Sequence, residues 1–272
     1  MKAALSGPSF PYKPCWKLLS EMSKSGKAQR KLKVEGKELS SLPEELFNFE
    51  DTQILKMSPE RESCLSYQMG FVPKEIGHLM NLTALYIDSN NLQEIPPEVG
   101  MLKNLKRLVL SNNALSILPL ELGMLQNLQS IHLANNNFTI FPSVICHCPN
   151  LTFLDISDNK IEIIPPTIEH LKNLETLLLL FNRISKLPKG LCSLTKLRCL
   201  WLGNNNIREL PDSFGNLALL DWGDNYCSFD LDGNPLNKPP IEVCMGGPQR
   251  IKAYFSSYHN NACYNVDFRV IS

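Results

Sequence analysis

The chain has 272 residues, and its 27 basic and 27 acidic side chains give a formal net charge of zero. General nucleic-acid binders and anionic-membrane binders carry a basic excess, so this balance predicts neither kind of partner. The sequence contains no apolar run of roughly 18 residues that would predict a membrane-spanning helix. Residues 1–12 are interrupted by Gly7, Pro8 and Pro11, which does not fit the apolar region of a secretory signal.

The first part of the chain, residues 1–28, lies outside any repeated pattern. We expect residues 1–12 to be unstructured and residues 14–25 to form a short amphipathic helix with Trp16 and Leu19 on its apolar side. Because the end of a repeat array must cover its last apolar row, this helix is interpreted as a cap. The basic run over residues 24–31 is interpreted as a solvated surface, with a docking patch as the alternative.

Two imperfect units follow, opening at Leu32 and Thr52. Lys37 stands in the first unit where later units have asparagine, and the second unit carries extra residues within 58–71. The insertion is interpreted either as an irregularity or as a loop that contacts a partner.

One pattern is then written six times, with a constant spacing of 23 residues. The copies begin at Leu82, Leu105, Leu128, Leu151, Leu174 and Leu197. Each has leucine-like residues at its first, fourth and sixth places, asparagine at its ninth and proline at its fifteenth. The alternating triplet predicts a short strand, the asparagine should pair backbone groups inside the coil, and the proline should start the outer return.

The pattern resumes six residues late after Leu220, and a C-terminal segment follows it. Ile251, Tyr254 and Phe255 at helical spacing predict a capping helix over residues 248–257, and residues 258–272 are expected to be an unstructured tail. We therefore expect an N-terminal segment over 1–28, a solenoid of about nine repeats over 29–247, and a C-terminal cap and tail over 248–272.

The repeated pattern matches the L-x-x-L-x-L-x-x-N-x-L signature of a leucine-rich repeat. It predicts an α/β fold, a right-handed solenoid or horseshoe with a parallel β-sheet on its concave face. The L-P-x-x-I/L-x-x-L continuation, as at Leu187-Pro188 and Leu210-Pro211, resembles the intracellular Ras-suppressor-like class of these proteins. That resemblance implies an intracellular scaffold or adaptor for a protein partner, in some members a small GTPase or a phosphatase.

Recognition is expected on the strand positions that face the concave side, and we expect the protein to be a monomer. The run Leu177–Phe181 is unusual, because its register leaves Leu178, Leu180 and Phe181 facing water beside Trp201 and Phe153. Exposed apolar clusters with aromatic anchors mark interfaces, although another part of the same chain could cover this one. The full set of candidate partner-binding residues is Tyr86, Val109, His132, Phe153, Asp155, Leu178, Leu180, Phe181 and Trp201.

The sequence offers little for catalysis. It has no phosphate-binding loop, dinucleotide fingerprint or nucleophile elbow, so we predict that the protein is not an enzyme and needs no cofactor. Cys146, His147 and Cys148 could be metal ligands, but Cys148 stands where other repeats have leucine and is expected in the core. His132 and Asp155, on adjacent strands, form a candidate charge pair without a nucleophile nearby.

Two alternatives to an adaptor remain open. A secreted or receptor-type ectodomain would fit three glycosylation tripeptides that begin at Asn81, Asn137 and Asn150. However, the nine scattered cysteines do not form the terminal disulfide caps of secreted members, so we expect reduced thiols and a cytoplasmic location. The other alternative is a regulatory repeat domain of a signalling enzyme or GTPase complex.

Overall fold

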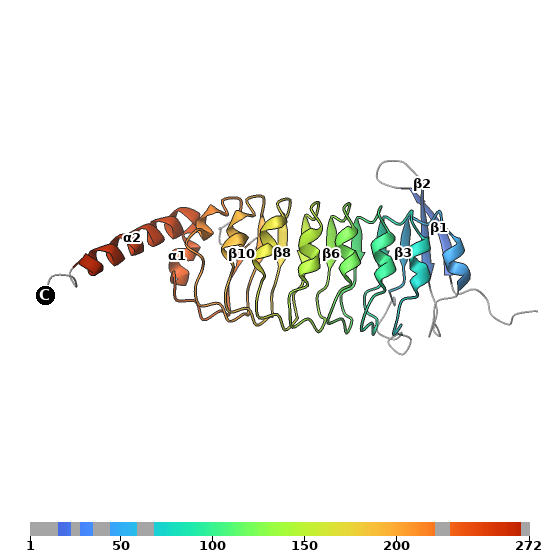
Figure 1. The fold of residues 1–272 in the computed structure, drawn as a ribbon, viewed down its shortest axis with the longest axis horizontal. Coiled ribbons are helices and arrows are strands. Elements are labelled where there is room, and N and C mark those ends of the chain that lie inside the picture. Colours follow the sequence, from blue (N-terminus) through green and yellow to red (C-terminus); the bar gives the residue numbers. More distant parts are fainter. Residues whose placement is uncertain (1–15, 23–27, 35–43, 59–67, 221–228, 268–272) are drawn as a thin grey trace, which may run out of the picture.

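The computed structural model describes residues 16–22, 28–34, 44–58, 68–220 and 229–267. One open sheet runs along the molecule, and its strand order follows the chain (Figure 1). The strands are β1 (Trp16–Met22), β2 (Ala28–Val34), β3 (Ile54–Lys56), β4 (Ala84–Tyr86), β5 (Arg107–Val109), β6 (Ser130–His132), β7 (Phe153–Asp155), β8 (Thr176–Leu178), β9 (Cys199–Trp201) and β10 (Phe229–Asp230). Strands β2 to β10 pair in parallel, which confirms the predicted solenoid sheet.

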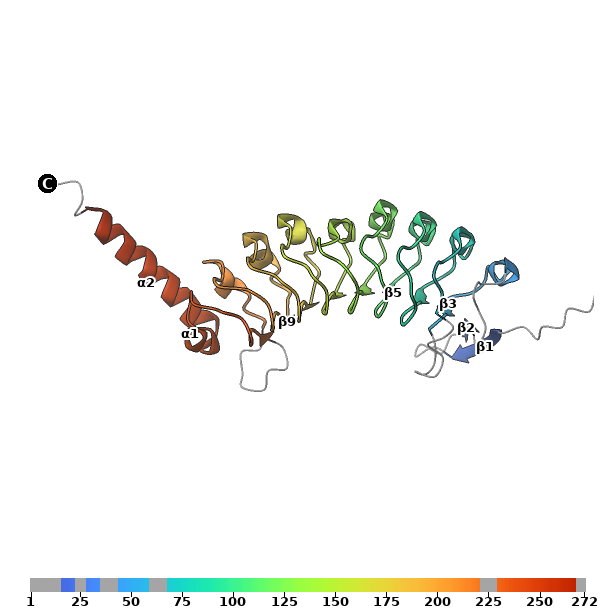
Figure 2. The ribbon, with the colours of Figure 1, turned by 90° about the horizontal axis from the view of Figure 1, so that it is seen from below.

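Short 3₁₀ turns form the opposite side of the coil. They are η1 (Glu44–Asn48), η3 (Lys74–His78), η4 (Pro97–Met101), η5 (Leu120–Met124), η6 (Ser143–His147), η7 (Pro166–His170), η8 (Lys189–Ser193) and η9 (Phe214–Asn216). In η4, as in its neighbours, the fifteenth-place proline, Pro96, directly precedes the turn. Figure 2 shows the strands on the inner side of a shallow arc and the turns on its outer side. Strands stack only about 4.8 Å apart and helical turns are wider, so the stack bends towards the strands.

The core follows the alternation within each strand. In β4 and the residue after it, Leu85 and Ile87 are fully buried while Tyr86 between them is half-buried on the sheet face. Leu108, Ile131, Leu154, Leu177 and Leu200 occupy the place of Leu85 in the following repeats and are equally buried. Each repeat thus adds one apolar layer to a continuous core.

The ninth-place asparagines form the predicted ladder, here called the asparagine ladder. Its members are Asn90, Asn113, Asn136, Asn159, Asn182, Asn205 and, in the irregular last repeat, Asn234. Asn136 is typical: its Oδ1 accepts from Leu115 N at 3.0 Å, and its Nδ2 donates to Leu110 O at 3.1 Å and Leu133 O at 3.0 Å. Every ladder side chain therefore joins two neighbouring repeats through their buried backbone.

The residue before each regular ladder asparagine has a left-handed backbone. The φ values are 60° at Ser89, 57° at Asn112, 53° at Asn135, 52° at Asp158, 51° at Phe181 and 55° at Asn204. Asparagine and aspartate tolerate this conformation because their short polar side chains bond locally, whereas bulky residues rarely adopt it. Phe181 is the exception in an otherwise polar series.

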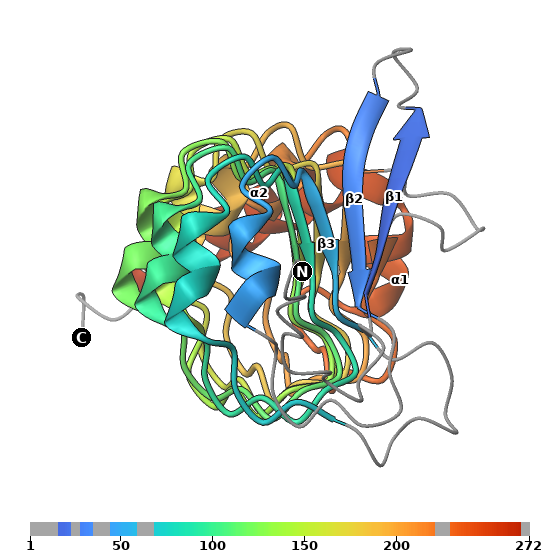
Figure 3. The same cartoon turned by 90° about the vertical axis from the view of Figure 1, so that its right-hand side faces the viewer.

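The predicted N-terminal capping helix is wrong. Residues 16–22 form strand β1, which pairs antiparallel with β2 from Trp16↔Val34 to Met22↔Ala28. Seen along the molecule, this hairpin stands at the N-terminal edge of the sheet (Figure 3). A sheet edge carries unpaired backbone groups, and an added strand satisfies those of β2 where a helix would leave them open.

The C-terminal cap is helical, as predicted, and is longer than expected. A short helix, α1 (Ile241–Met245), leads into α2 (Gly247–Asp267), where Ile251 and Phe255 are buried against the solenoid. The helix extends over residues 258–267, for which an unstructured tail was predicted; the predictions for residues 1–12, for most of the 58–71 insertion and for 268–272 lie outside the described residues. Among the described residues, no helix is both long enough and apolar enough to cross a membrane.

Candidate interaction surface

Six of the candidate residues form one row across the sheet. The strand register pairs Tyr86 with Val109, Val109 with His132, His132 with Asp155, Asp155 with Leu178, and Leu178 with Trp201. All six side chains are half-buried, as expected on the solvated face of a sheet. Since adjacent strands lie about 4.8 Å apart, Tyr86 is roughly 19 Å from Leu178, so the row holds more than one local environment.

Polar side chains surround the N-terminal end of the row, at Tyr86. The Lys56 ammonium lies 5.0 Å from the centre of the Tyr86 ring, a cation–π distance. Asp88, after β4, accepts a hydrogen bond from the Ser58 hydroxyl. These contacts hold Tyr86 and Asp88 in place.

His132, which with Asp155 was a candidate charge pair, packs on an aromatic ring. Its ring centre lies 4.6 Å from that of Phe153, and its Nε2 lies 2.9 Å from Ser130 Oγ. Burial of the imidazole lowers the pKa of His132 below its ordinary value of 6.5, against the opposing attraction of Asp155. The ring is therefore neutral near pH 7 and serves as part of an aromatic surface.

The candidate apolar residues towards the C-terminal half of the row, here called the apolar cluster, are Phe153, Leu178, Leu180, Phe181 and Trp201. Leu178 is paired directly with Trp201, and Phe153 lies on the strand next to Thr176. Phe181 is 53% exposed, while the other four are half-buried, so Phe181 is the most accessible member. The Trp201 Nε1 atom is covered and donates to no acceptor within the described part of the chain.

Carboxylates flank the paired residues Leu178 and Trp201 on both sides. In the row itself, Asp155 precedes Leu178 and Asp230 follows Trp201. Each carboxylate is held by a local turn: Asp155 Oδ1 accepts from Ser157 N at 3.1 Å, and Asp230 Oδ1 accepts from Asp232 N at 2.8 Å. The surface thus alternates acidic, apolar and acidic along the solenoid.

The sequence interpretation missed part of this arrangement. It named Asp155 but not Asp230, because the last repeat returns six residues late and its register was uncertain. The signal was present nonetheless, since Asp230 stands two residues before Asp232-Gly233-Asn234, the counterpart of the turn that precedes each ladder asparagine.

Four cysteines, Cys146, Cys148, Cys192 and Cys244, are buried, and Cys199 is half-buried; burial raises the pKa of all five thiols. Cys146 and Cys148 are buried and His147 is exposed, and Cys148 fills a leucine place with its Sγ 3.6 Å from Leu122 O. Burial raises the pKa of the Cys148 thiol to about 12. A thiol of this kind is neither a ready nucleophile nor a ready metal ligand.

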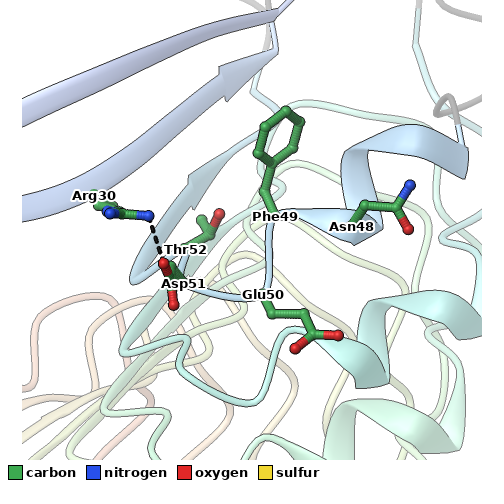
Figure 4. Close-up of a pocket in the computed structure, with 6 residues that line it drawn as sticks. All are labelled: Arg30, Asn48, Phe49, Glu50, Asp51 and Thr52. Carbon is green, nitrogen blue, oxygen red and sulfur yellow. Dashed lines mark hydrogen bonds and ion pairs between the residues drawn. The ribbon is translucent and has the colours of Figure 1, made fainter.

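A small hollow lies at the N-terminal end, away from the row. It has a volume of about 290 Å³ and is lined by Arg30, Asn48, Phe49, Glu50, Asp51 and Thr52 (Figure 4). Arg30 Nη1 donates to Asp51 Oδ2 across it, and both side chains are exposed. An exposed ion pair of this kind contributes little and assigns no ligand.

Comparison with known proteins agrees with the repeat pattern and the fold. A family profile described as "Leucine rich repeat" matches residues 80–138, and one described as "Leucine-rich repeat region" matches residues 142–222. The chain is a leucine-rich-repeat protein. The comparison with curated proteins gave no match.

Three solved structures illustrate the range of similar leucine-rich-repeat proteins. A leucine-rich-repeat protein of Leptospira interrogans has 31% identity and a TM-score of 0.68, over 79% of this chain and 51% of that one. The plant peptide hormone receptor RGFR1, solved with RGF2, has 31% identity and a TM-score of 0.60, over 72% and 30%. The ectodomain of the receptor kinase GASSHO1/SCHENGEN3 from Arabidopsis thaliana, solved with CASPARIAN STRIP INTEGRITY FACTOR 2, has 25% identity and a TM-score of 0.59, over 80% and 28%.

This leucine-rich-repeat protein therefore spans about half the length of the Leptospira protein and about a third of each receptor. In this chain the leucines, asparagines and prolines of the repeat frame build the coil. The surface residues that would select a partner differ from frame residues and are specific to each protein.

Proposed function

We propose that this protein is a non-catalytic interaction scaffold, an adaptor that binds a protein partner on the concave face through the apolar cluster. The solenoid holds that face rigid through its core and its asparagine ladder. A surface that is ordered in advance loses little conformational entropy on binding, so its contacts convert more fully into affinity. Rigid presentation is the mechanism we assign to it.

The backbone of Phe181 carries this proposal. At the same place, the other five regular repeats have serine, asparagine or aspartate, all with positive φ. A bulky residue in that region costs roughly 1–3 kcal/mol, and such outliers cluster at functional sites. Phe181 is also 53% exposed, so its ring is not kept there by burial in the core.

The flanking carboxylates indicate the chemistry of the partner. Three strand steps separate Asp155 from Asp230, through Leu178 and Trp201, or about 14 Å at 4.8 Å per strand. An extended peptide advances about 3.3 Å per residue and covers this span in roughly four residues. We infer a partner segment with an apolar side chain between two basic residues about four positions apart.

Purification of partners from cells tests the proposal. Phe181→Asn removes the ring and inserts the residue that Asn112 and Asn135 show to be compatible with this backbone. We expect it to lose a specific partner that the wild type retains, with little change in melting temperature. Asn112→Ser is the matched control at the same place of another repeat and should keep the partner.

Charge reversal separates the two parts of the surface. Asp155→Lys and Asp230→Lys should each weaken binding of the same partner, and the wild-type complex should weaken with salt. Retention of the same partners by Phe181→Asn and by both aspartate variants would refute binding on this face. By the resemblance to the Ras-suppressor-like class, an intracellular small GTPase or phosphatase is the first candidate partner to examine.

A receptor-type ectodomain is the second candidate function, favoured by the two plant receptors that were solved with RGF2 and with CASPARIAN STRIP INTEGRITY FACTOR 2. The glycosylation tripeptides support it less, because two of their asparagines already bond the backbone of the neighbouring repeat. Asn81 Nδ2 donates to Glu50 O at 3.1 Å, and Asn150 Nδ2 donates to Gln126 O at 2.9 Å. Imaging of the endogenous protein with a surface-accessible tag distinguishes the two locations.

A further inference from the structure

A stripe of exposed isoleucines crosses three consecutive repeats, on a different surface from the apolar cluster. Ile117, Ile140 and Ile163 stand at the thirteenth place of their repeats, and their exposed fractions are 65%, 78% and 69%. This place lies after the ladder asparagine and before the outer turn, on the flank that joins the concave and convex sides. Leu120, which is 82% exposed, adjoins the stripe at the start of η5.

Side chains at the thirteenth place are direct neighbours from repeat to repeat. The backbone of Ile163 forms a parallel bridge with that of Lys186, the residue at the same place of the next repeat. A contiguous apolar surface of this kind marks an interaction site, whereas isolated exposed isoleucines would not. No segment within the described residues covers these side chains.

The two ends of the stripe carry opposite charges. Glu94 stands at the thirteenth place one repeat before Ile117, and Lys186 stands there one repeat after Ile163. Both side chains are exposed, and neither forms an ion pair within the described chain. The order along the flank is therefore acidic, three isoleucines, basic, and it is symmetric in spacing about Ile140.

We propose that this flank joins two copies of the chain in an antiparallel pair with a two-fold axis through Ile140. In such a pair Ile140 meets its own copy, Ile117 meets Ile163, and Glu94 of each copy meets Lys186 of the other. A two-fold interface must be self-complementary, since the same surface serves both subunits. The stripe meets that condition in the order of its residues and in charge.

The surroundings of Lys186 fit this arrangement. A hollow of about 430 Å³ lies beside it between two repeats, and its charged lining residues are Lys186, Lys189, Arg208, Glu209 and Asp212. At the other end of the stripe, Glu98 on η4 adds a second carboxylate four residues after Glu94. The acidic end of one copy would thus approach the more basic end of the other.

The isoleucines and the charges have separate parts in the pair. Burial of apolar surface supplies most of the association free energy. Exposed ion pairs are individually weak, but two of them per dimer favour the antiparallel arrangement over a parallel one, in which like charges would meet. Such a pair would replace the monomer that the sequence alone led us to expect.

Sedimentation velocity of the full chain over a range of concentrations tests the pair. The wild type is expected to dimerise, and Ile140→Glu to be monomeric, because it places two carboxylates on the symmetry axis. Glu94→Lys and Lys186→Glu should each weaken dimerisation about tenfold or more, because each converts two attractive pairs into two repulsive ones. Thermal melts should match the wild type for all three, since the altered side chains are exposed.

Charge exchange makes the test specific. A mixture of Glu94→Lys and Lys186→Glu should form a heterodimer as tight as the wild type. In that heterodimer the two introduced charges are opposite and face each other at one contact, while the native Glu94 and Lys186 face each other at the second. Phe181→Asn should leave dimerisation unchanged, so failure of the concave-face proposal and failure of this one are distinguishable. A wild type that stays monomeric, an Ile140→Glu variant that still dimerises, or a mixture that does not recover would each overturn the inference.

Discussion

Removal of one asparagine from the middle of the asparagine ladder should lower the free energy of unfolding by an amount that its hydrogen bonds determine. In Asn136→Ala, the buried Leu115 N–H loses its acceptor, which lies at 3.0 Å in the wild type. Asn136 Nδ2 serves three carbonyls, and each keeps another donor. Asn113 Nδ2 bonds Leu110 O at 3.0 Å and Asn159 Nδ2 bonds Leu133 O at 3.1 Å. The third carbonyl, Ala134 O, keeps its bond from Asn112 N at 2.8 Å. One donor is therefore fully orphaned and three further bonds are lost, the longest of them at 3.3 Å.

An orphaned buried donor costs about 1–3 kcal/mol and each lost bond about 0.5–1.5 kcal/mol, so the total should be at least about 3 kcal/mol. For a chain of this size that loss lowers the melting temperature by roughly 6–12 °C. Urea denaturation followed by circular dichroism measures it. Asn136→Asp, which keeps the acceptor but turns a carboxylate towards three carbonyls, should lose at least as much near neutral pH.

Asn137→Ala is the matched control for this measurement. Its side chain is exposed and accepts only from Lys160 Nζ at 3.1 Å, so its removal should change stability by less than about 0.5 kcal/mol. Equal losses in the two variants, or a loss below about 1 kcal/mol in Asn136→Ala, would refute the view that the ladder is a principal support of the stack.

Acidification is expected to destabilise the wild type more than His132→Gln. Burial lowers the pKa of His132 in the folded state, so below about pH 6.5 the unfolded chain binds the proton more readily than the folded one. The free energy of unfolding therefore decreases as the pH falls from about 6.5 to the lowered pKa of the folded state. A difference in melting temperature that is the same at about pH 7 and about pH 5 would contradict this. In the native protein, iodoacetamide should modify the half-buried Cys199 before the fully buried Cys148, as peptide mass spectrometry can show; the reverse order would be inconsistent with the packing. Gly100→Ala would place a Cβ 2.4 Å from Glu121 O in the backbone of the next turn and should cost about 1–3 kcal/mol in urea denaturation, whereas an unchanged midpoint would show that η4 and η5 can separate freely.

The regular part of the fold was predictable because one short pattern indicates both which side chains are buried and which side chain bonds the backbone of the turn. Leu85 and Ile87 occupy the inward places of a strand, and Asn90 follows at the one place where the turning backbone needs an amide. Repetition at a fixed spacing then determines which strands are neighbours, so the usual problem of long-range pairing does not arise. The sheet order and the ladder follow from this.

The strand at the N-terminus was not predictable, because this segment belongs to no repeat and its own pattern fits two structures. Trp16, Leu18 and Met22 fit the spacing of a strand as well as that of a helix, and seven residues are too few to separate the two periods. The strand forms because β2 offers an open edge, and that edge belongs to a part of the chain outside the segment itself. The sequence of residues 16–22 alone does not indicate that this edge is present.

The candidate surface was predictable in position but not in detail. Register alone placed Leu178 and Trp201 side by side, as observed. The exposure of Phe181 relative to its neighbours depends on how side chains on adjacent strands cover one another, which register does not give. Its left-handed backbone, however, was signalled by the serine, asparagines and aspartate at the same place of the other repeats.

The asparagine ladder also makes each repeat depend on the repeat that is synthesised after it. Leu115 N–H is satisfied by an asparagine 21 residues further along, and the same offset recurs from repeat to repeat. A repeat that has just left the ribosome therefore presents this N–H to water until the next repeat emerges to cover and pair it, roughly one to four seconds later at ordinary rates of translation. Each repeat is completed by its successor, and the irregular last repeat, through Asn234, closes the series by accepting from Ile207 N at 3.0 Å.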